Sequence, residues 1–460
     1  MSTDFTAFPH PPAHQIPDPA PMPLAAATVA PRSLRHRATP PRSDQQHHTA
    51  PPTLPPAPAP LRGLDHLAPW LRRDRPAAVT VLTDPAVAHQ PVTTLALAQI
   101  ARAGITARTL TLTDAGGLDA IAELAARLTH RELIVSIGGG TILDFAKLTA
   151  LTAQYPRAIR YLTAPQRSGF VILPPSLGDH VRVLAIPTTL GTGSERGTVA
   201  CFTKNHAKHL ALGPCLRPVA ALWAPEATAT LPDHLIADGV LEALFRTVSP
   251  YAGDPTELLL PDQAVEALAA RILVAGYEVA ALRREHRPIP DELRLRIAEM
   301  SAESQLGHTN QGRNPYSVKC WAIANELSTT VNLPKMRTVS ALWPVLWRRT
   351  LAGDTRLGSP HRIRRLWAHL RHGAAWLDPD PAQGLLQLID EWHINRTVTA
   401  NTTDIARAAQ ATIRAWGAGL PILAELSAAD LRTLLAEATK PAAADTASVS
   451  AAVSKTTTAH

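Results

Sequence analysis

Three consecutive glycines stand between an apolar run and a stretch with helical periodicity, in the sequence SIGGGTILDFAK: Gly138, Gly139 and Gly140. Glycine has no Cβ atom, so its backbone can approach a phosphate closely. Free N–H groups at a helix start stabilise such an anion, and Thr141 adds a hydroxyl there. Asp144 and Lys147 follow three residues apart and share one helix face. The stretch predicts a phosphate-binding turn, although a tight strand–helix turn without a ligand would also use glycine.

A second stretch, LAIPTTLGTGSE at 184–195, places small hydroxyl residues and glycines after another strand-like run. Such residues offer hydrogen-bond donors without bulk. The residues in question are Pro187, Thr188, Thr189, Gly191, Thr192, Gly193, Ser194 and Glu195. The two stretches begin about fifty residues apart, and their pairing is far more specific than either one alone.

The elements that must position these stretches alternate between two periodicities. Strand-like runs at 77–84, 107–113, 132–137 and 181–189 alternate with helical patterns, which predicts parallel βαβ units. Beyond about residue 232 the strand signals fade and helical periodicity takes over. We therefore predict an α/β domain at 62–232 and an all-helical domain, with the active-site cleft, at 233–436.

Composition narrows the function further. The 460 residues are 45% hydrophobic and 18% charged, as expected of a soluble globular protein with a large core. The formal charge of +7 comes from scattered arginines without aromatic-basic interleaving, so we expect no nucleic-acid partner. Three cysteines without metal spacing indicate reduced thiols and a cytoplasmic location. No apolar run is long enough for a membrane span.

The two ends of the chain differ from the rest in composition. Residues 1–60 are rich in Pro, Ala and His, and residues 437–460 are rich in Ala, Thr and Ser. Dense prolines remove backbone donors, and such polar segments cannot bury enough apolar surface to fold. We predict that both segments are disordered.

The two glycine-containing stretches together closely resemble the iron-containing alcohol dehydrogenase family, which is related to glycerol dehydrogenase and dehydroquinate synthase. The marks of that family are a GGGS/T-x-x-D-x-x-K turn and a PTT-x-GTGSE loop, and both occur here. The resemblance extends over roughly 62–436. It implies a Rossmann-like, parallel-sheet domain that binds NAD, followed by a helical domain.

The resemblance also implies roles for single residues. Gly138–Gly140 and Thr141 would hold the pyrophosphate of NAD. Further residues would line the same cleft or reach a ribose: Asp144, Thr188, Thr189, Ser194 and Lys208. Asp84, after the first strand-like run, resembles the residue near the adenosine ribose. Its charge would repel a 2′-phosphate, which favours NAD over NADP.

The family's dehydrogenases hold a divalent metal with one Asp and three His, in the patterns G-x-D-A-x-x-H, H-A-x-A-H and HG-x-x-x-A-x-x-x-P. The metal lowers the pKa of the substrate alcohol. Counting from Gly239, Leu241 and Phe245 take the ligand positions of the first pattern. Trp321 and Asn325 take the histidines of the second, and the matching segment 334–344 contains no histidine. We therefore expect no metal.

Basic and polar residues remain in this region: Arg246, His308, Asn310, Arg313, Lys319, Asn325, Lys335 and Arg337. Solvent-facing charges would account for them. Alternatively, fixed cations replace the metal as stabilisers of an alkoxide, or clamp a substrate carboxylate. On that hypothesis the candidate catalytic residues are Lys319, Arg337 and His308.

These expectations favour an NAD-dependent oxidoreductase that oxidises a secondary alcohol. The substrate would be a small molecule or a peptide with a carboxylate, in specialised metabolism such as oxidative decarboxylation of a ribosomal peptide's C-terminal Thr; a homodimer is left open. One alternative is a sugar-phosphate cyclase of the dehydroquinate synthase type, with Glu242 and His308 as metal ligands. Another is a catalytically silent NAD-binding partner protein.

Overall fold

The computed structural model describes residues 58–113, 117–129, 131–205, 207–417 and 420–441. Nearly all of the predicted N-terminal extension therefore lies outside the described residues. The described chain ends at Pro441, a few residues inside the segment predicted as a C-terminal tail. The disorder predicted for the two ends stays a prediction.

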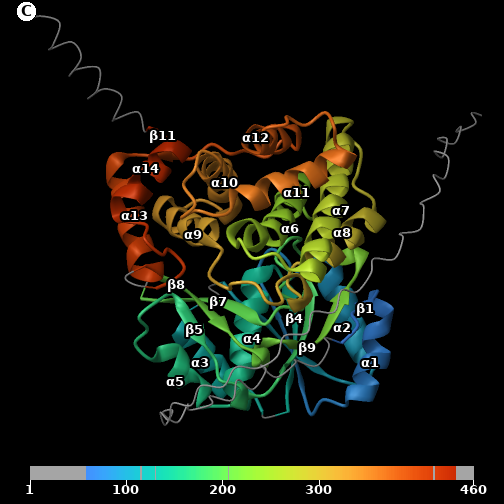
Figure 1. Ribbon diagram of the computed structural model, residues 1–460. Helices are drawn as coiled ribbons and strands as arrows, with labels where there is room; N and C mark the ends of the chain where they lie inside the picture. The colour runs from blue at the N-terminus through green and yellow to red at the C-terminus, as the bar shows by residue number, and fades with distance from the viewer. Residues whose placement is uncertain (1–57, 114–116, 130, 206, 418–419, 442–460) are drawn as a thin grey trace, which may run out of the picture. The chain divides into compact units, whose positions relative to one another are not determined.

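A parallel sheet of six strands organises the first part of the described chain (Figure 1). In order across the sheet these are β1 (Leu61–Arg62), β9 (Pro218–Trp223), β6 (Val181–Pro187), β4 (Leu133–Gly138), β2 (Val79–Thr83) and β3 (Ala107–Thr111). Every pair of neighbours is parallel. The predicted α/β class with a parallel sheet is confirmed, and β1 and β9 add strands that the sequence analysis did not predict.

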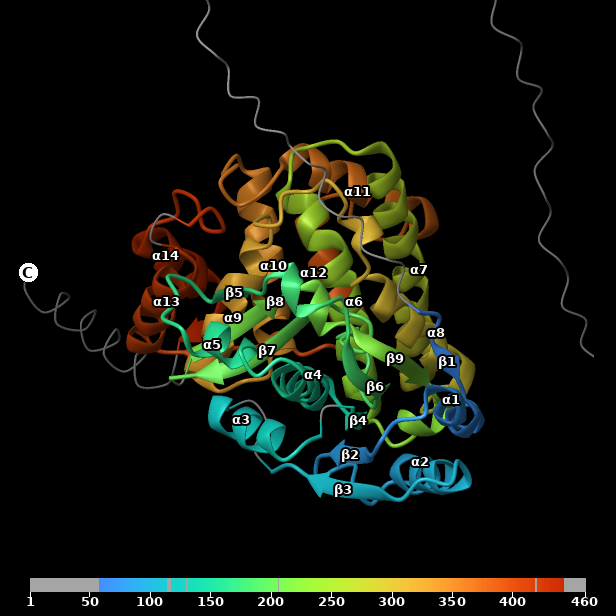
Figure 2. The ribbon, with the colours of Figure 1, turned by 90° about the horizontal axis from the view of Figure 1, so that it is seen from below.

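Alternate residues of the sheet's strands face opposite sides. Apolar residues on both sides are buried, because helices cover both faces. Ile134 and Val183 pack into one core, whereas Val135 and Leu184 pack into the other. The first core is covered by α3 (Leu118–Ala126), α4 (Gly140–Gln154) and α5 (Ala158–Thr163). The second is covered by α1 (Leu67–Asp74) and α2 (Pro91–Arg102), on the other side of the strands in Figure 2.

The strand order creates a switch point beside β2. The chain passes from β2 to β3 on one side of it and returns to β4 on the other. In such sheets ligands bind outside the carboxyl ends of the strands at the switch point. Thr83 lies opposite Ile137, and Gly138 lies opposite Pro187. The segments that follow β2, β4 and β6 therefore leave the sheet side by side.

A second sheet of three strands was not predicted from the sequence. It consists of β5 (Phe170–Ile172), β8 (Ala207–Leu212) and β7 (Val199–Lys204) in that order. Strands β7 and β8 are antiparallel, and β5 and β8 are parallel. This sheet joins α4 through the apolar side chains of Val171, Ala200 and Phe202.

Helices dominate the chain from residue 233 onward, as the periodicity predicted. They are α6 (Asp233–Gly253), α7 (Leu259–Arg284), α8 (Asp291–Glu303), α9 (Lys319–Val331), α10 (Lys335–Leu351), α11 (Pro360–Gly373), α12 (Pro381–Glu391), α13 (Thr402–Trp416) and α14 (Ala428–Ala438). Two short strands, β10 (Thr399–Ala400) and β11 (Lys440–Pro441), pair in parallel. The predicted domain boundary near 232 stays a prediction.

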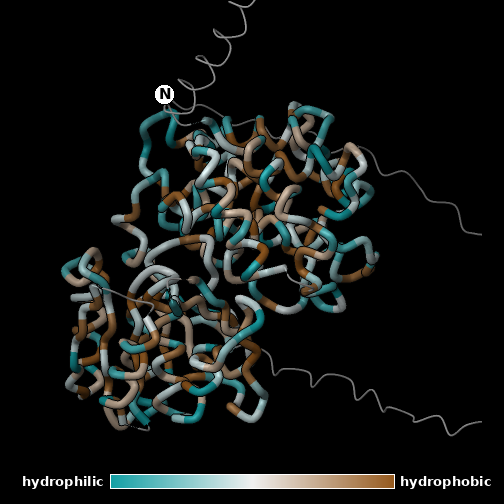
Figure 3. The backbone as a smooth tube through the Cα atoms, turned by 90° about the vertical axis from the view of Figure 1, so that its left-hand side faces the viewer, coloured by the Kyte–Doolittle hydropathy of each residue, from teal (hydrophilic) through white to brown (hydrophobic). Residues whose placement is uncertain are grey.

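The helices share one apolar core, which also includes Leu190 and Trp223 from the sheet-containing part. Brown, apolar stretches run along the helices and strands in Figure 3, and teal stretches gather in turns and outer segments. Within the described ranges, no helix combines the length and the apolar character that crossing a bilayer needs.

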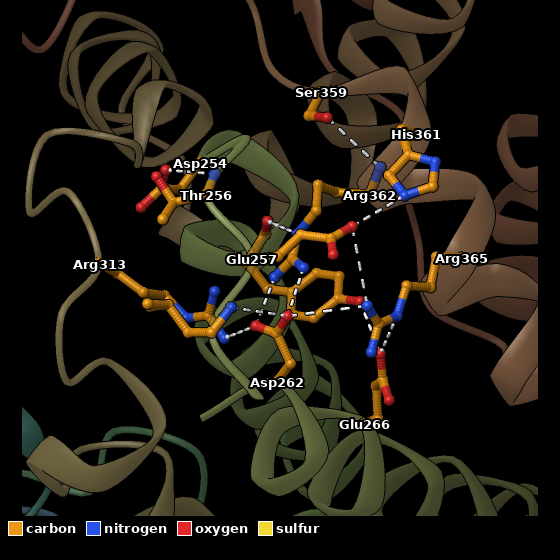
Figure 4. Close-up of polar contacts among 12 residues, drawn as sticks. Asp254, Thr256, Glu257, Asp262, Glu266, Arg313, Ser359, His361, Arg362 and Arg365 are labelled. Atoms are coloured by element: carbon orange, nitrogen blue, oxygen red, sulfur yellow. Dashed lines mark hydrogen bonds and ion pairs between the residues drawn. The ribbon is translucent and has the colours of Figure 1, made fainter. Parts of the chain in front are cut away.

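A buried carboxylate ties several of these helices together (Figure 4). Asp262 of α7 accepts hydrogen bonds from Arg362 of α11 at 2.5 and 2.6 Å. It also accepts one from Arg313, in the segment before α9, at 2.7 Å. Arg362 lies over the ring of Tyr251 in α6, 3.7 Å from its centroid. Burial alone would raise the pKa of Asp262, but the hydrogen bonds from both guanidinium groups outweigh it and lower the pKa to about 2.

We expect Asp262→Asn to lower the free energy of unfolding by about 3–5 kcal/mol, because it leaves two buried guanidinium groups without their counter-ion. Urea unfolding at pH 7 measures this. Asp390→Asn is the matched control, since Asp390 also binds one arginine through two bonds, but both side chains are about half exposed. The control should lose no more than about 1 kcal/mol. Equal losses in the two variants would contradict the central role of Asp262.

Candidate active site

The glycine turn lies where β4 ends and α4 begins. Gly139 is the N-cap of α4, and no side chain caps this helix start. Thr141 is exposed in its first turn. An uncapped helix start presents free N–H groups, so the turn fits an anion such as a pyrophosphate. A Cβ atom on Gly139 or Gly140 would also press on a threonine, at 3.2 Å from Thr189 or 3.0 Å from Thr192.

The loop after β6 packs directly against this turn and against two helices beyond it. The Thr188 amide donates to the Gly138 carbonyl at 3.0 Å. Further on, the Gly191 amide donates to Ser301 Oγ of α8 at 3.0 Å. Gln305, just after α8, donates to the Thr192 carbonyl at 2.8 Å. The loop is therefore anchored at both sides, with the glycine turn on one side and the helical part of the chain on the other.

Asp144 and Ser194 contact each other. Ser194 Oγ donates to the Asp144 carboxylate at 2.5 Å, and the Cys201 amide donates to its other oxygen at 2.9 Å. The ammonium of the fully buried Lys147 lies 3.6 Å from Asp144 and donates to the Val199 carbonyl. Burial lowers the pKa of Lys147, against the raising effect of Asp144. These contacts join α4 to the loop and to β7, which explains Asp144 and Ser194 without any ligand.

Asp84 and Lys208 lie beside different sheets. Asp84 follows β2, and its Oδ1 accepts from the amides of Ala86 and Val87 at 2.9 and 3.1 Å. The carboxylate therefore closes the turn after β2, beside the start of the glycine turn. Lys208 is exposed on β8, opposite Thr203 of β7. The structure brings Asp84, the glycine turn and the 187–195 loop to one edge of the sheet.

Three charged side chains meet beneath the 187–195 loop. Glu242 of α6 is buried, and its Oε1 accepts from Arg246 Nη2 at 2.7 Å and from Lys335 Nζ at 2.5 Å. The Arg246 and Lys335 side chains are 24% and 26% exposed, so solvent reaches both cations. Burial alone would raise the pKa of Glu242, but Lys335 and Arg246 outweigh it and lower the pKa to about 2. We call Glu242, Arg246 and Lys335 the charged triad.

The charged triad changes how the metal patterns align with this chain. Leu241 and Phe245, which counting from Gly239 placed at ligand positions, are 0% and 2% exposed and lie in the helical core. One residue further on, EALFR at 242–246 keeps the D-A-x-x-H spacing, with Glu242 for Asp and Arg246 for His. Lys335 stands nine residues before Pro344, as the histidine does in HG-x-x-x-A-x-x-x-P. Burial and spacing therefore favour a register one residue later than the count from Gly239.

These residues do not fit a divalent metal. Ammonium and guanidinium groups have no lone pair to donate, and Glu242 is already bonded to both cations. Trp321 packs edge-on against Trp416, 5.2 Å between centroids. Among the described residues, no three His, Cys, Asp or Glu side chains converge. The same facts weigh against a cyclase site, because Glu242 is engaged in the charged triad and His308 is half exposed beside Glu303.

The three predicted catalytic residues lie in different surroundings. Lys319, at the start of α9, lines a cavity of about 20 Å³ with Cys320 and two tryptophans, which is room for about one water. Burial lowers its pKa. The Arg337 guanidinium donates to the Asn395 carbonyl. Arg337 and His308 thus have partners outside the charged triad, Lys319 lines a separate small cavity, and the catalytic role of all three stays untested.

Comparison with known proteins now adds to this geometry. Residues 62–225 match a family model described as iron-containing alcohol dehydrogenase. A phosphonoacetaldehyde reductase of Streptomyces viridochromogenes is 40% identical over 135 residues, which are 27% of this chain and 33% of that protein. The NADPH-dependent aldehyde reductase YqhD of Escherichia coli is 27% identical over 46% of this chain and 53% of its own length. The matched region thus spans about a third to a half of these relatives.

The fold comparison reaches further along the chain. NADH-dependent butanol dehydrogenase A of Thermotoga maritima superposes with a TM-score of 0.66 at 16% identity, over 84% of this chain and 98% of that structure. An alcohol dehydrogenase of Oenococcus oeni gives 0.67 at 18% identity. The family model therefore confirms the resemblance to iron-containing alcohol dehydrogenases over residues 62–225, and the solved structures share the fold over most of the chain.

The pKa of Glu242 makes a prediction about stability. Because the folded pKa of about 2 lies below the ordinary value of 4.5, the ionised carboxylate stabilises the fold fully above about pH 4.5, and this contribution is lost as pH falls toward 2. Glu242→Gln should therefore cost about 3 kcal/mol at pH 7. The difference in free energy of unfolding between wild type and variant should narrow below pH 4.5. Urea unfolding at pH 7, 5, 4 and 3 measures this difference.

Glu278→Gln is the matched control for this experiment. Glu278 binds Arg296 with both side chains about 45% exposed. It should cost no more than about 1 kcal/mol at any of these pH values. A Glu242→Gln variant as stable as this control at pH 7 would contradict the charged triad.

Proposed function

We propose that the protein is an alcohol dehydrogenase-type oxidoreductase that uses a nicotinamide dinucleotide. The observation that carries this is the convergence of three strand ends at the switch point of the sheet. Asp84, the Gly138–Gly140 turn and the 187–195 loop follow the neighbouring strands β2, β4 and β6. An uncapped helix start lies at the centre of this edge. Matches to proteins named as aldehyde reductases and alcohol dehydrogenases support the same reaction class.

The substrate of this oxidoreductase is an alcohol or the corresponding carbonyl compound, and an acidic group on it would suit the positive charge of the site. The names of two matched proteins, a phosphonoacetaldehyde reductase and a hydroxyacid-oxoacid transhydrogenase, refer to substrates with such a group. The peptide carboxylate of an oxidative decarboxylation is one member of this class. Turnover assays of small hydroxy acids beside uncharged secondary alcohols of the same size would test whether the substrate carries an acidic group.

Gly139→Val should weaken nicotinamide dinucleotide binding by at least about 100-fold, or about 3 kcal/mol. The backbone at Gly139, with φ −74°, suits any residue, so the fold should tolerate the change. The added branches would press on Thr189 and crowd the space in front of the helix start. Calorimetric titration with NAD and with NADP measures the loss.

Gly117→Val is the matched control for Gly139→Val. Gly117 is also the N-cap of a helix, α3, with similar φ, and a Cβ atom there meets no atom within 4 Å. Its dinucleotide affinity should equal that of wild type. Unchanged affinity in a folded Gly139→Val protein would remove the glycine turn from the binding site.

Asp84→Asn should shift the preference from NAD toward NADP by roughly 1–3 kcal/mol, because it removes repulsion of the 2′-phosphate. Asparagine keeps the side-chain oxygen that caps Ala86 and Val87, so the turn stays closed. The ratio of the two dissociation constants is the measurement. Asp119→Asn, at an exposed carboxylate in the first turn of α3, controls for the change in net charge. A ratio that moves equally in both variants would assign Asp84 to the turn alone.

A further inference from the structure

Counted among its own three side chains, the charged triad carries a net positive charge beside the proposed dinucleotide site. One carboxylate, Glu242, is shared by two cations through the same oxygen atom. Two positive charges on one carboxylate leave a surplus of one positive charge. Lys335 has three N–H donors, and one of them is engaged with Glu242 in the described part of the chain. Arg246 Nε is buried and has no hydrogen-bond partner among the described residues. Both cations therefore retain donors for a ligand.

The triad lies next to the loop that follows β6. Gly191 of that loop has φ +97°, and a Cβ atom on it would lie 2.9 Å from the Glu242 Cβ atom. The charges of the triad also reach β7. Burial raises the pKa of the Cys201 thiol to about 11, Asp144 adds to this, and the positive charges of Lys335, Lys208 and Arg246 oppose it. Lys208, expected near the cofactor ribose, thus acts on the same thiol as two cations of the triad.

The triad occupies positions at which the family's patterns place metal ligands. In the corrected register, Glu242 stands for the Asp, and Arg246 and Lys335 stand for two of the histidines. Trp321, fourteen residues before Lys335, stands for another and is held by Trp416. Two of the four positions have thus changed from neutral electron-pair donors to permanent cations. A divalent ion there would meet repulsion from both, with one engaged carboxylate to hold it.

We infer that Lys335 and Arg246, held in place by Glu242, supply the positive charge that a metal supplies in this family, and that they hydrogen-bond to the reacting oxygen of the substrate. This inference rests on the proposed function. During oxidation the carbinol C–H bond breaks and its electron pair leaves as hydride to the oxidised nicotinamide. The O–H bond breaks, its proton leaves to water, and the C=O bond forms. The two cations stabilise the negative charge that develops on the oxygen. This negative charge is larger in the transition state than in the bound alcohol.

The first test compares the rate of turnover with dinucleotide binding. Lys335→Met should lower kcat by about 100-fold or more, as loss of an oxyanion donor does. The dissociation constant for the dinucleotide should change by less than about threefold, because the charge acts mainly on the transition state. Lys335→Arg keeps the charge and should recover part of the rate. Lys440→Met, an exposed lysine on β11, is the matched control and should leave kcat unchanged.

Three outcomes of the first test overturn the inference. An unchanged kcat in folded Lys335→Met would show a purely structural ion pair. A raised KM with unchanged kcat would make Lys335 a static clamp on a substrate carboxylate. A Lys335→Arg variant as slow as Lys335→Met, at equal unfolding midpoints, would show that the charge is not what matters. In each case dinucleotide-dependent turnover of the wild type would leave the proposed function standing.

The second test does not depend on activity. The four positions are changed together to the residues of the family's patterns: Glu242→Asp, Arg246→His, Trp321→His and Lys335→His. After dialysis against Zn²⁺ or Fe²⁺, this variant should retain about one ion per chain, whereas the wild-type protein should retain none. A folded variant that binds no metal would show that the four positions do not converge as inferred. One tightly bound Zn²⁺ or Fe²⁺ ion per chain in the wild-type protein would likewise overturn the inference. If the wild-type protein showed no turnover, the proposed function would be contradicted. The metal-binding test would still decide whether the four positions converge.

Discussion

The structure depends on a contact between two backbones that leaves no room for a side chain on either. A Cβ atom on Gly191 would lie 2.5 Å from the Gly239 carbonyl oxygen, and one on Gly239 would lie 2.7 Å from the Leu190 carbonyl oxygen. Gly191 also has positive φ, which favours glycine on its own account. Two glycines therefore hold the loop after β6 directly on α6. Any side chain at either position would push the loop away from the helix.

That contact puts two kinds of chemistry within reach of each other. On one side of the loop lies the helix start of α4, where backbone N–H groups are free for an anion. On the other side lies Glu242, one helical turn beyond Gly239, with its two cations. Hydrogen bonds from Ser301 and Gln305 in the region of α8 fix the loop from a third direction. The loop is thus held by the glycine turn, α6 and the region of α8, so the distance between the helix start and the charged triad is set by packing rather than by a flexible linker.

Much of this architecture could be predicted from the sequence, because local patterns determine it. Burial on both faces of the sheet gave β2, β4 and β6 nearly continuous apolar runs, and glycines mark the turn after β4. The register of the charged triad could not be read by counting from Gly239, since one residue separates the core-facing Leu241 from the site-facing Glu242 on a helix buried over most of its surface. The preserved spacing of EALFR, and of Lys335 to Pro344, was the signal that would have found it.

Partners far apart in sequence left no local signal. Arg313 and Arg362 reach Asp262 over 51 and 100 residues. Strand β5 pairs with β8 across the whole of β6 and β7.

The two halves of the site follow different physical rules, and this explains where the resemblance to known proteins is strong. A phosphate held by backbone N–H groups needs glycines, a strand end and a helix start, and few other residues satisfy that geometry. The family model accordingly covers residues 62–225 and stops shortly before α6 begins at Asp233. Stabilising one negative oxygen needs only positive charge at the right place, which a metal ion or a pair of held cations can supply. Arg246 and Lys335, each about a quarter exposed, would repel each other without a carboxylate between them, so Glu242 is what allows both cations to lie together. On the inference made above, the acid at position 242 is therefore the residue that lets two held cations take the place of a metal ion.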